Sequence, residues 1–136
     1  MGSKRLATVV CLALLTLVGC RDRSTVQNKQ DKLCSSVADL DGSATQIAAV
    51  QPDAAGVARI KVLRLEMQAQ YKRLQDAAKD AQAIRIDPIT QAYNKVLSAT
   101  NGINTPTALA QAQPKINEAV GEFSDARTQL NQSAGC

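Results

Sequence analysis

Four cysteines are the residues of this 136-residue chain with the widest choice of chemistry: Cys11, Cys20, Cys34 and Cys136. A thiol can carry a lipid, form a disulfide, bind a metal or act as a nucleophile. The chain contains no histidine, the side chain most often used as a general base and a common metal ligand. The sequence therefore favours covalent uses of the cysteines, and we expect no cofactor and no metal.

Acidic side chains offer the other route to catalysis. Glu118, Glu122 and Asp125 are spaced like the exposed face of a helix rather than like a pair that converges in a cleft. No phosphate-binding glycine loop, nucleophile elbow or metal-ligand spacing occurs elsewhere. We therefore expect that the protein is not an enzyme.

The first nineteen residues form a segment of a distinct kind. Lys4 and Arg5 precede an apolar run over 6–18, which is too short for the ~20 residues that cross a bilayer as a helix. A basic start, a short apolar stretch and a small residue before the cut are typical of a secretory signal peptide. Residues 1–19 are predicted to be removed, and Cys11 with them.

The end of this segment reads Leu17-Val18-Gly19-Cys20. It resembles the lipobox of bacterial lipoproteins, in which a branched residue, a tolerant position and a small residue precede an obligatory cysteine. The resemblance covers the first twenty residues only. It implies cleavage between Gly19 and Cys20, a diacylglyceryl group on Cys20 and acylation of the new amine. An ordinary secretory signal with an incidental cysteine is the alternative.

By the same resemblance, the protein would be lipid-anchored at a bacterial cell membrane or outer membrane, exposed to the periplasm or the cell exterior. Cys34 and Cys136 would then remain in an oxidising compartment, where an even pair of cysteines favours a disulfide. A metal site or a reactive thiol are the alternatives. Two cysteines without histidine make a poor zinc site.

The composition excludes a common class of partner. Loss of Lys4 and Arg5 lowers the net charge from +4 to +2, and the aromatic residues are only Tyr71, Tyr93 and Phe123. A nucleic-acid-binding protein usually shows a basic stripe and stacking aromatic residues. We expect no nucleic acid among the partners.

Apolar residues recur at three- and four-residue steps, which predicts an all-α fold. The first helix is expected at about 26–50, a long central one at about 53–100 and the last at about 106–133. Their apolar stripes comprise Val26, Leu33, Val37, Leu40, Ala44 and Ile47; then Ile60, Leu63, Met67, Leu74, Ala77, Ala81, Ile84, Ala92, Val96 and Ala99; then Leu109, Ala112, Ile116, Ala119, Phe123, Ala126 and Leu130.

The breaks between these helices carry turn and capping residues. Pro52 ends the first helix and Asp53 is a plausible cap for the next. Asn101-Gly102 is a stop signal. Thr105-Pro106 is a start signal, with a capping hydroxyl followed by proline at the first helical position.

Pro88 is ambiguous, because it either kinks one long helix or opens a new one. Helical rise alone places Cys136 ~6 Å from the level of Cys34 in the kinked arrangement and ~43 Å away if the chain reverses. A disulfide therefore predicts the kinked central helix and an elongated antiparallel helical bundle or coiled-coil rod. The expected organisation is a signal peptide at 1–19, a lipidated tether at 20–29 and a helical domain at 30–136.

The surface of the central helix suggests a contact role. Its basic residues Arg59, Lys61, Arg64, Lys72 and Arg73 are candidates for contact with a membrane or a partner. Apolar residues that flank the stripes either widen the core or form a second contact face: Val57, Val62, Leu65, Ile86, Ile89 and Leu97.

These features favour a membrane-anchored structural or protein-interaction module. Its partner would be another envelope protein or a second copy of the chain. The alternative is a carrier lipoprotein for a lipid or a small ligand.

Overall fold

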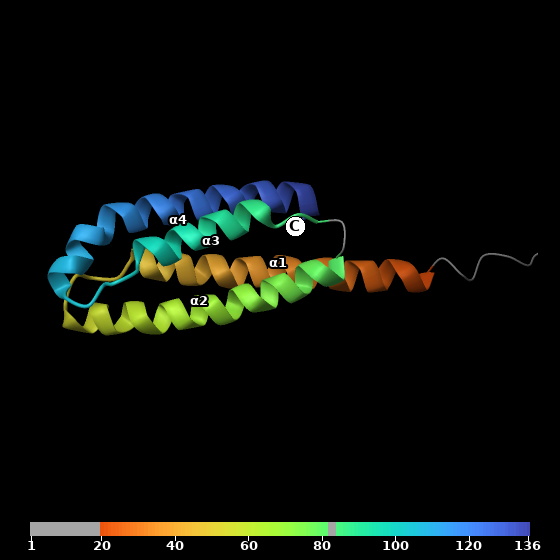
Figure 1. Ribbon diagram of the computed structural model, residues 1–136. Helices are drawn as coiled ribbons and strands as arrows, with labels where there is room; N and C mark the ends of the chain where they lie inside the picture. Colours follow the sequence, from red (N-terminus) through yellow and green to blue (C-terminus); the bar gives the residue numbers. More distant parts are fainter. Residues whose placement is uncertain (1–19, 82–83) are drawn as a thin grey trace, which may run out of the picture.

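A computed structural model of the protein describes residues 20–81 and 84–136, with side chains from residue 25 onward. This part of the chain contains four helices and no strand: α1 (Cys20–Ala48), α2 (Ala54–Ala81), α3 (Asp87–Ala99) and α4 (Pro106–Ala134). Successive helices run antiparallel and form an elongated bundle (Figure 1). The predicted all-α fold and the antiparallel bundle are confirmed.

The predicted central helix at 53–100 is wrong in one respect, because it is two helices. α2 ends at Ala81 and α3 begins at Asp87, and the chain reverses direction between them (Figure 1). Pro88 lies in the first turn of α3, where its missing N–H costs no helical hydrogen bond. The reversal also packs α3 on α4 and α4 on α1, which buries more apolar surface than a rod two helices thick.

The predicted disulfide is present although the chain reverses. Cys34 and Cys136 are bonded, with their Cα atoms 5.7 Å apart. The expectation of a ~43 Å gap counted helical rise only. The connections between helices also move the chain along the bundle, and a residue outside a helix can advance up to ~3.3 Å against 1.5 Å in a helix.

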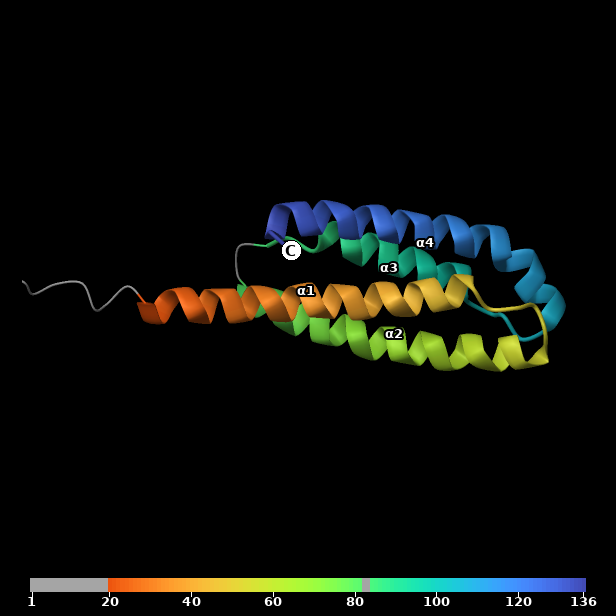
Figure 2. The same cartoon turned by 180° about the vertical axis from the view of Figure 1, so that it is seen from behind.

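Residues 20–29 were expected to form a tether that could extend, and they are part of α1 instead. This segment contains no glycine or proline, so nothing in it stops the helix that follows. The first turns of α1 project beyond the other three helices (Figures 1 and 2). Val26, expected on the core stripe, is therefore exposed.

The predicted breaks are confirmed, with side-chain caps at two of them. The Asp53 carboxylate accepts a hydrogen bond from the Gly56 amide at 2.6 Å, and the Thr105 hydroxyl accepts one from the Ala108 amide at 3.1 Å. Gly102 has a φ of 72°, a left-handed conformation that glycine adopts without strain. Gly56 is required for a different reason, since a Cβ there would lie 1.9 Å from the Gln51 carbonyl oxygen.

The core follows the predicted stripes along all four helices. Its largest fully buried side chains include Phe123 from α4, Leu40 from α1 and Met67 from α2. Ala81, Ile84, Ala99 and Ala112 are only partly buried at the edge of the core. The remaining stripe residues apart from Val26 are buried, so the three- and four-residue spacing identified the inward faces correctly.

Candidate functional site

The cysteines divide into two groups in the structure. Cys34 and Cys136 are consumed by the disulfide, so neither is available as a metal ligand or a reactive thiol. Gly19 lies outside the described residues. Cys20 begins α1, but its side chain is also outside the described part. Cleavage at Gly19 and Cys20 and lipidation of Cys20 stay predictions.

The basic residues predicted for contact lie on α2, and four of the five are exposed: Arg59, Lys61, Lys72 and Arg73. Arg59 donates a hydrogen bond to the Gln46 side chain of α1 at 2.7 Å. Arg64 is half-buried, and its guanidinium donates to the Thr100 hydroxyl at 3.2 Å. Arg64 therefore ties α2 to the C-terminal end of α3, whereas the other four can meet a partner.

The apolar residues that flank the predicted stripes also divide into exposed and buried ones. Val62 and Leu65 are 46% and 67% exposed on α2. Val57 and Ile89 are buried, while Ile86 and Leu97 pack partly against the core. Only two of the six residues expected in a second contact face are therefore on the surface.

Val62 and Leu65 belong to an exposed stripe whose other members were not predicted from the sequence. Ala58, Val62, Leu65 and Ala69 recur at steps of four, three and four on α2, and all four are exposed. This spacing places them on one side of the helix, opposite its core-facing residues such as Leu63 and Met67. The sequence pattern that could have revealed this stripe is a second heptad-like series, offset from the buried one. It is hard to recognise because two of its members are alanines, which occur throughout the helices.

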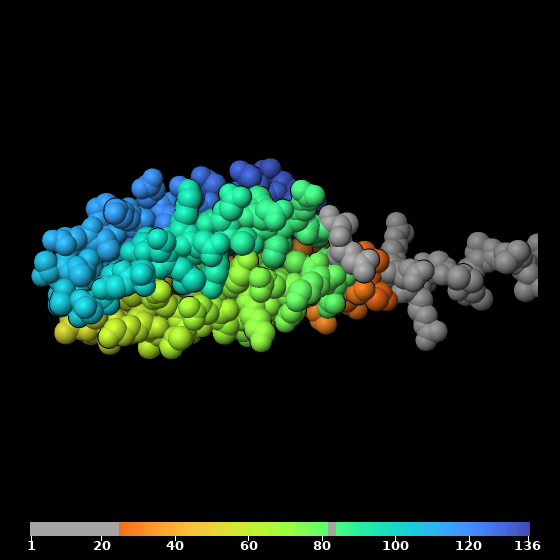
Figure 3. Space-filling model, in the orientation of Figure 1, coloured from red at the N-terminus to blue at the C-terminus, as the bar shows by residue number. Residues whose placement is uncertain are grey.

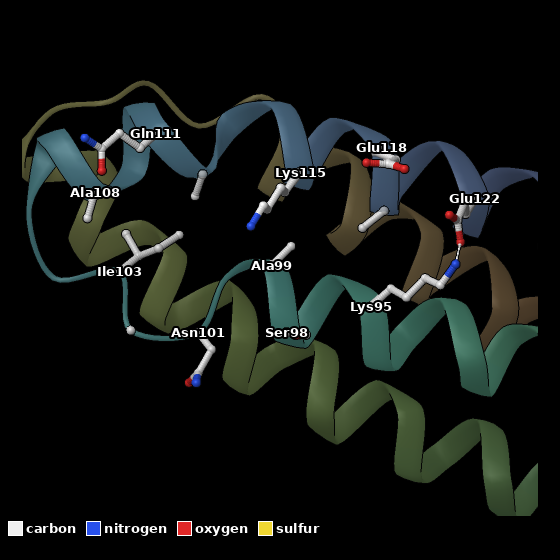
Figure 4. A pocket seen from close by; sticks show the side chains of 13 residues that line it. Lys95, Ser98, Ala99, Asn101, Ile103, Ala108, Gln111, Lys115, Glu118 and Glu122 are labelled. Atoms are coloured by element: carbon white, nitrogen blue, oxygen red, sulfur yellow. Dashed lines mark hydrogen bonds and ion pairs between the residues drawn. The ribbon is translucent and has the colours of Figure 1, made fainter.

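A groove of ≈ 590 Å³ lies between α3, α4 and the 100–105 connection (Figure 4). Lys95 of α3 forms an ion pair with Glu122 of α4 across it. Figure 4 shows Lys115 reaching from α4 toward α3, with Glu118 one turn farther along α4. The groove is therefore a surface recess with charges of both signs. Glu122 is neutralised by a lysine and is not part of a carboxylate pair.

A polar and aromatic layer connects α2 to α3. The rings of Tyr71 and Tyr93 stack with their centroids 4.0 Å apart. The Tyr71 hydroxyl donates to the Thr90 hydroxyl at 2.8 Å. Burial, and next the neighbouring Tyr71, raise the pKa of Tyr93 above its ordinary value. The stacked rings pack α2 against α3.

The described residues contain no group of three or more acidic, cysteine or histidine side chains that could hold a metal ion. None of the helices α1 to α4 combines the length and the hydropathy that a membrane span requires.

Comparisons of the chain with protein-family models, with curated proteins and with solved structures give no match. The candidate surfaces therefore rest on their own geometry.

Proposed function

We propose that the protein is a membrane-anchored cell-envelope lipoprotein, not an enzyme, that serves as a helical structural or protein-interaction module. The anchoring part of the proposal is supported by the lipobox-like sequence Leu17-Val18-Gly19-Cys20. Under this proposal, the protein is held at a bacterial cell membrane or outer membrane and faces the periplasm or the exterior. Two or three acyl chains would hold it firmly, since each buried CH₂ contributes ~0.8 kcal/mol.

The position of Cys20 at the start of α1 is compatible with an anchor. The first turns of α1 project beyond the bundle (Figures 1 and 2). Ten helical residues advance ~15 Å, so a lipid on Cys20 would be joined to the bundle by a short helical stalk. Helical residues advance less than extended ones, so this stalk would hold the bundle closer to the membrane than an extended tether would.

The observation that carries the interaction role is the exposure of Val62 and Leu65 on α2. A single exposed apolar residue is ordinary on a protein surface, but a stripe of them with charged residues along its edges marks a contact site. Arg59 and Lys61 lie on the two edges of this stripe. The face is therefore suited to a protein partner that offers apolar and charged groups together.

The alternative function, carriage of a lipid or a small ligand, has less support. A lipid carrier needs an apolar cavity, and the core of this bundle is filled by fully buried side chains such as Phe123 and Leu63. The groove between α3 and α4 is lined by Lys95, Lys115 and Glu118. If the purified protein melted at a higher temperature with added phospholipid, the carrier function would be favoured instead.

Substitution of Cys20 tests the anchor. We expect Cys20→Ser in the full chain to abolish incorporation of a labelled fatty acid and to leave the protein unprocessed or released into the soluble fraction. Cys11→Ser is the matched control, because Cys11 lies within the predicted signal peptide and should be replaceable. A Cys20→Ser protein that is still cut before residue 20 and still held by the membrane would refute the lipid anchor.

A further inference from the structure

We propose that the outer stripe of α2 (Ala58, Val62, Leu65 and Ala69) docks onto the same stripe of a second copy of the chain, with the two α2 helices antiparallel. The inference deepens the proposed function and rests on it, since it names the partner of the interaction module.

The stripe has the residue spacing of a coiled-coil seam. Steps of four, three and four residues are those of the seam in a coiled coil, where alternating residues of each helix insert between residues of the other. Val62 and Leu65 supply the large side chains in the middle, and alanines at both ends let the helices approach closely. The N-terminal part of α2 lies along one border of the molecule (Figure 3), and all four residues of the stripe are exposed.

The charges along one edge of the stripe are complementary when two copies are related by a two-fold axis. Such an axis between Val62 and Leu65 places Val62 of each copy beside Leu65 of the other. Arg59 and Glu66 lie along the same edge of the stripe, seven residues apart. In the antiparallel pair, Arg59 of each copy faces Glu66 of the other, and the symmetry makes this contact twice.

These charges are available for a partner. The ion pairs within the described part of one copy are Lys79 with Asp76, Lys95 with Glu122, and Arg127 with Asp41. Neither Arg59 nor Glu66 takes part in them. The hydrogen bond from Arg59 to Gln46 is on the exposed surface, so the guanidinium can exchange it for a carboxylate.

The antiparallel arrangement is favoured over a parallel one by the next turn of the stripe. Lys72 and Asp76 continue its spacing toward the C-terminus of α2. A parallel pair would set Lys72 against Lys72 and Asp76 against Asp76, which costs free energy by like-charge repulsion. In the antiparallel pair Lys72 lies beside the small, exposed Ala55 of the other copy.

An anionic membrane surface is a poorer occupant of the same face. Glu66, Asp76 and Asp80 are exposed on α2 among its basic residues, and repulsion of their carboxylates by anionic head groups would offset part of the attraction of the cations. A second copy can pair Glu66 with a cation, whereas the lipid surface cannot.

The predicted interface is small, and its strength depends on where the protein is. Stable interfaces between soluble proteins bury about 1,200–2,000 Å², more than four residues per copy can supply. The two anchors of an antiparallel pair emerge at opposite ends, so both reach one membrane when the pair lies along its surface. Confinement there raises the effective concentration of the two copies, so contacts that are weak in solution become populated. We therefore expect association in the membrane and little at micromolar concentration in solution.

The experiment is photo-crosslinking in intact cells. A photoreactive amino acid replaces Leu65 in the full chain, and we expect a product of twice the mass of one copy. The same amino acid at Ala38, exposed on α1, is the control and should give at least fivefold less. Arg59→Glu alone and Glu66→Arg alone should each reduce the yield severalfold, and the double variant should restore it.

The outcomes separate the alternatives. In a parallel pair Glu66 would face Lys61, so Arg59→Glu would leave the yield unchanged, and the antiparallel proposal would fail. Crosslinks from residue 65 only to lipid would assign the face to the membrane. Crosslinks only to a different protein would overturn self-association but leave the interaction module standing. Loss of the anchor is scored separately, by fractionation of Cys20→Ser.

Discussion

Two contact regions of the bundle, the α1–α4 seam and the α2–α3 seam, are held by different kinds of contact. The backbones of α2 and α3 approach each other less closely than those of α1 and α4, and long side chains bridge them. At the α1–α4 seam, a disulfide joins Cys34 to Cys136 and the Arg127 guanidinium pairs with the Asp41 carboxylate at 2.6 Å. The Gln113 side chain also donates to the Ala48 carbonyl oxygen at 2.7 Å, at the C-terminus of α1. At the α2–α3 seam, the contacts are a tyrosine stack and hydrogen bonds between side chains.

The difference follows from the order of the helices along the chain. α2 and α3 are consecutive, and the groups that join Tyr71 to Thr90 are only 19 residues apart. α1 and α4 are the first and last helices, and the disulfide joins residues 102 positions apart. Closing a longer loop costs more chain entropy. The disulfide therefore joins the two helices that are farthest apart along the chain, whose association costs the most chain entropy.

Among the changes to these two seams, removing the disulfide should lower the stability of the bundle most. We expect Cys34→Ser with Cys136→Ser to lower the free energy of unfolding by about 2–5 kcal/mol, because the unfolded chain regains the entropy that the link removed. Urea denaturation followed by circular dichroism measures the change.

The reduced wild-type protein is the control and should match the double variant. A loss below about 1 kcal/mol, which the chain-entropy account does not allow for so long a loop, would show that packing alone holds the α1–α4 seam.

The sequence predicted most of the fold because its signals are local. Apolar spacing identified the inward faces, and Asp53 and Thr105 marked helix starts through capping side chains that contact residues three positions away. The disulfide followed from cysteine number and the expected compartment. None of these inferences required knowledge of which helices pack together.

The sequence did not predict the features that depend on contacts between residues far apart in the chain. Whether Pro88 kinks or starts a helix depends on whether the chain gains more when α4 packs against both α3 and α1, which is a property of the whole bundle. The count that favoured a kinked helix also neglected the connections between helices, where a residue can advance up to twice as far as in a helix. The exposed stripe on α2 was missed for a related reason, since Val57 and Val62 look alike until the packing direction is known.

Removing the Tyr71 hydroxyl should weaken the α2–α3 seam by a smaller amount. We expect Tyr71→Phe to cost about 0.5–1.5 kcal/mol, the net value of one hydrogen bond, because the hydroxyl donates to Thr90. Tyr93→Phe is the matched control at neutral pH, since it keeps the stacked ring. Equal unfolding free energies for Tyr71→Phe and the wild type would mean that the Tyr71 hydrogen bond does not stabilise the α2–α3 seam.

Alkaline pH should produce the smallest effect, through the buried Tyr93. Burial raises its pKa above the ordinary value of 10.0, so the folded state holds the proton more tightly than the unfolded state. The stabilisation is therefore fully present below pH ~10 and is lost as the pH rises through the folded-state pKa. Tyr93→Phe has no proton to lose at this position, so its unfolding free energy should fall less than that of the wild type between pH 8 and 11. Parallel pH profiles for the two proteins would show that the ring is solvated when the bundle is folded, and that the α2–α3 seam is open to water.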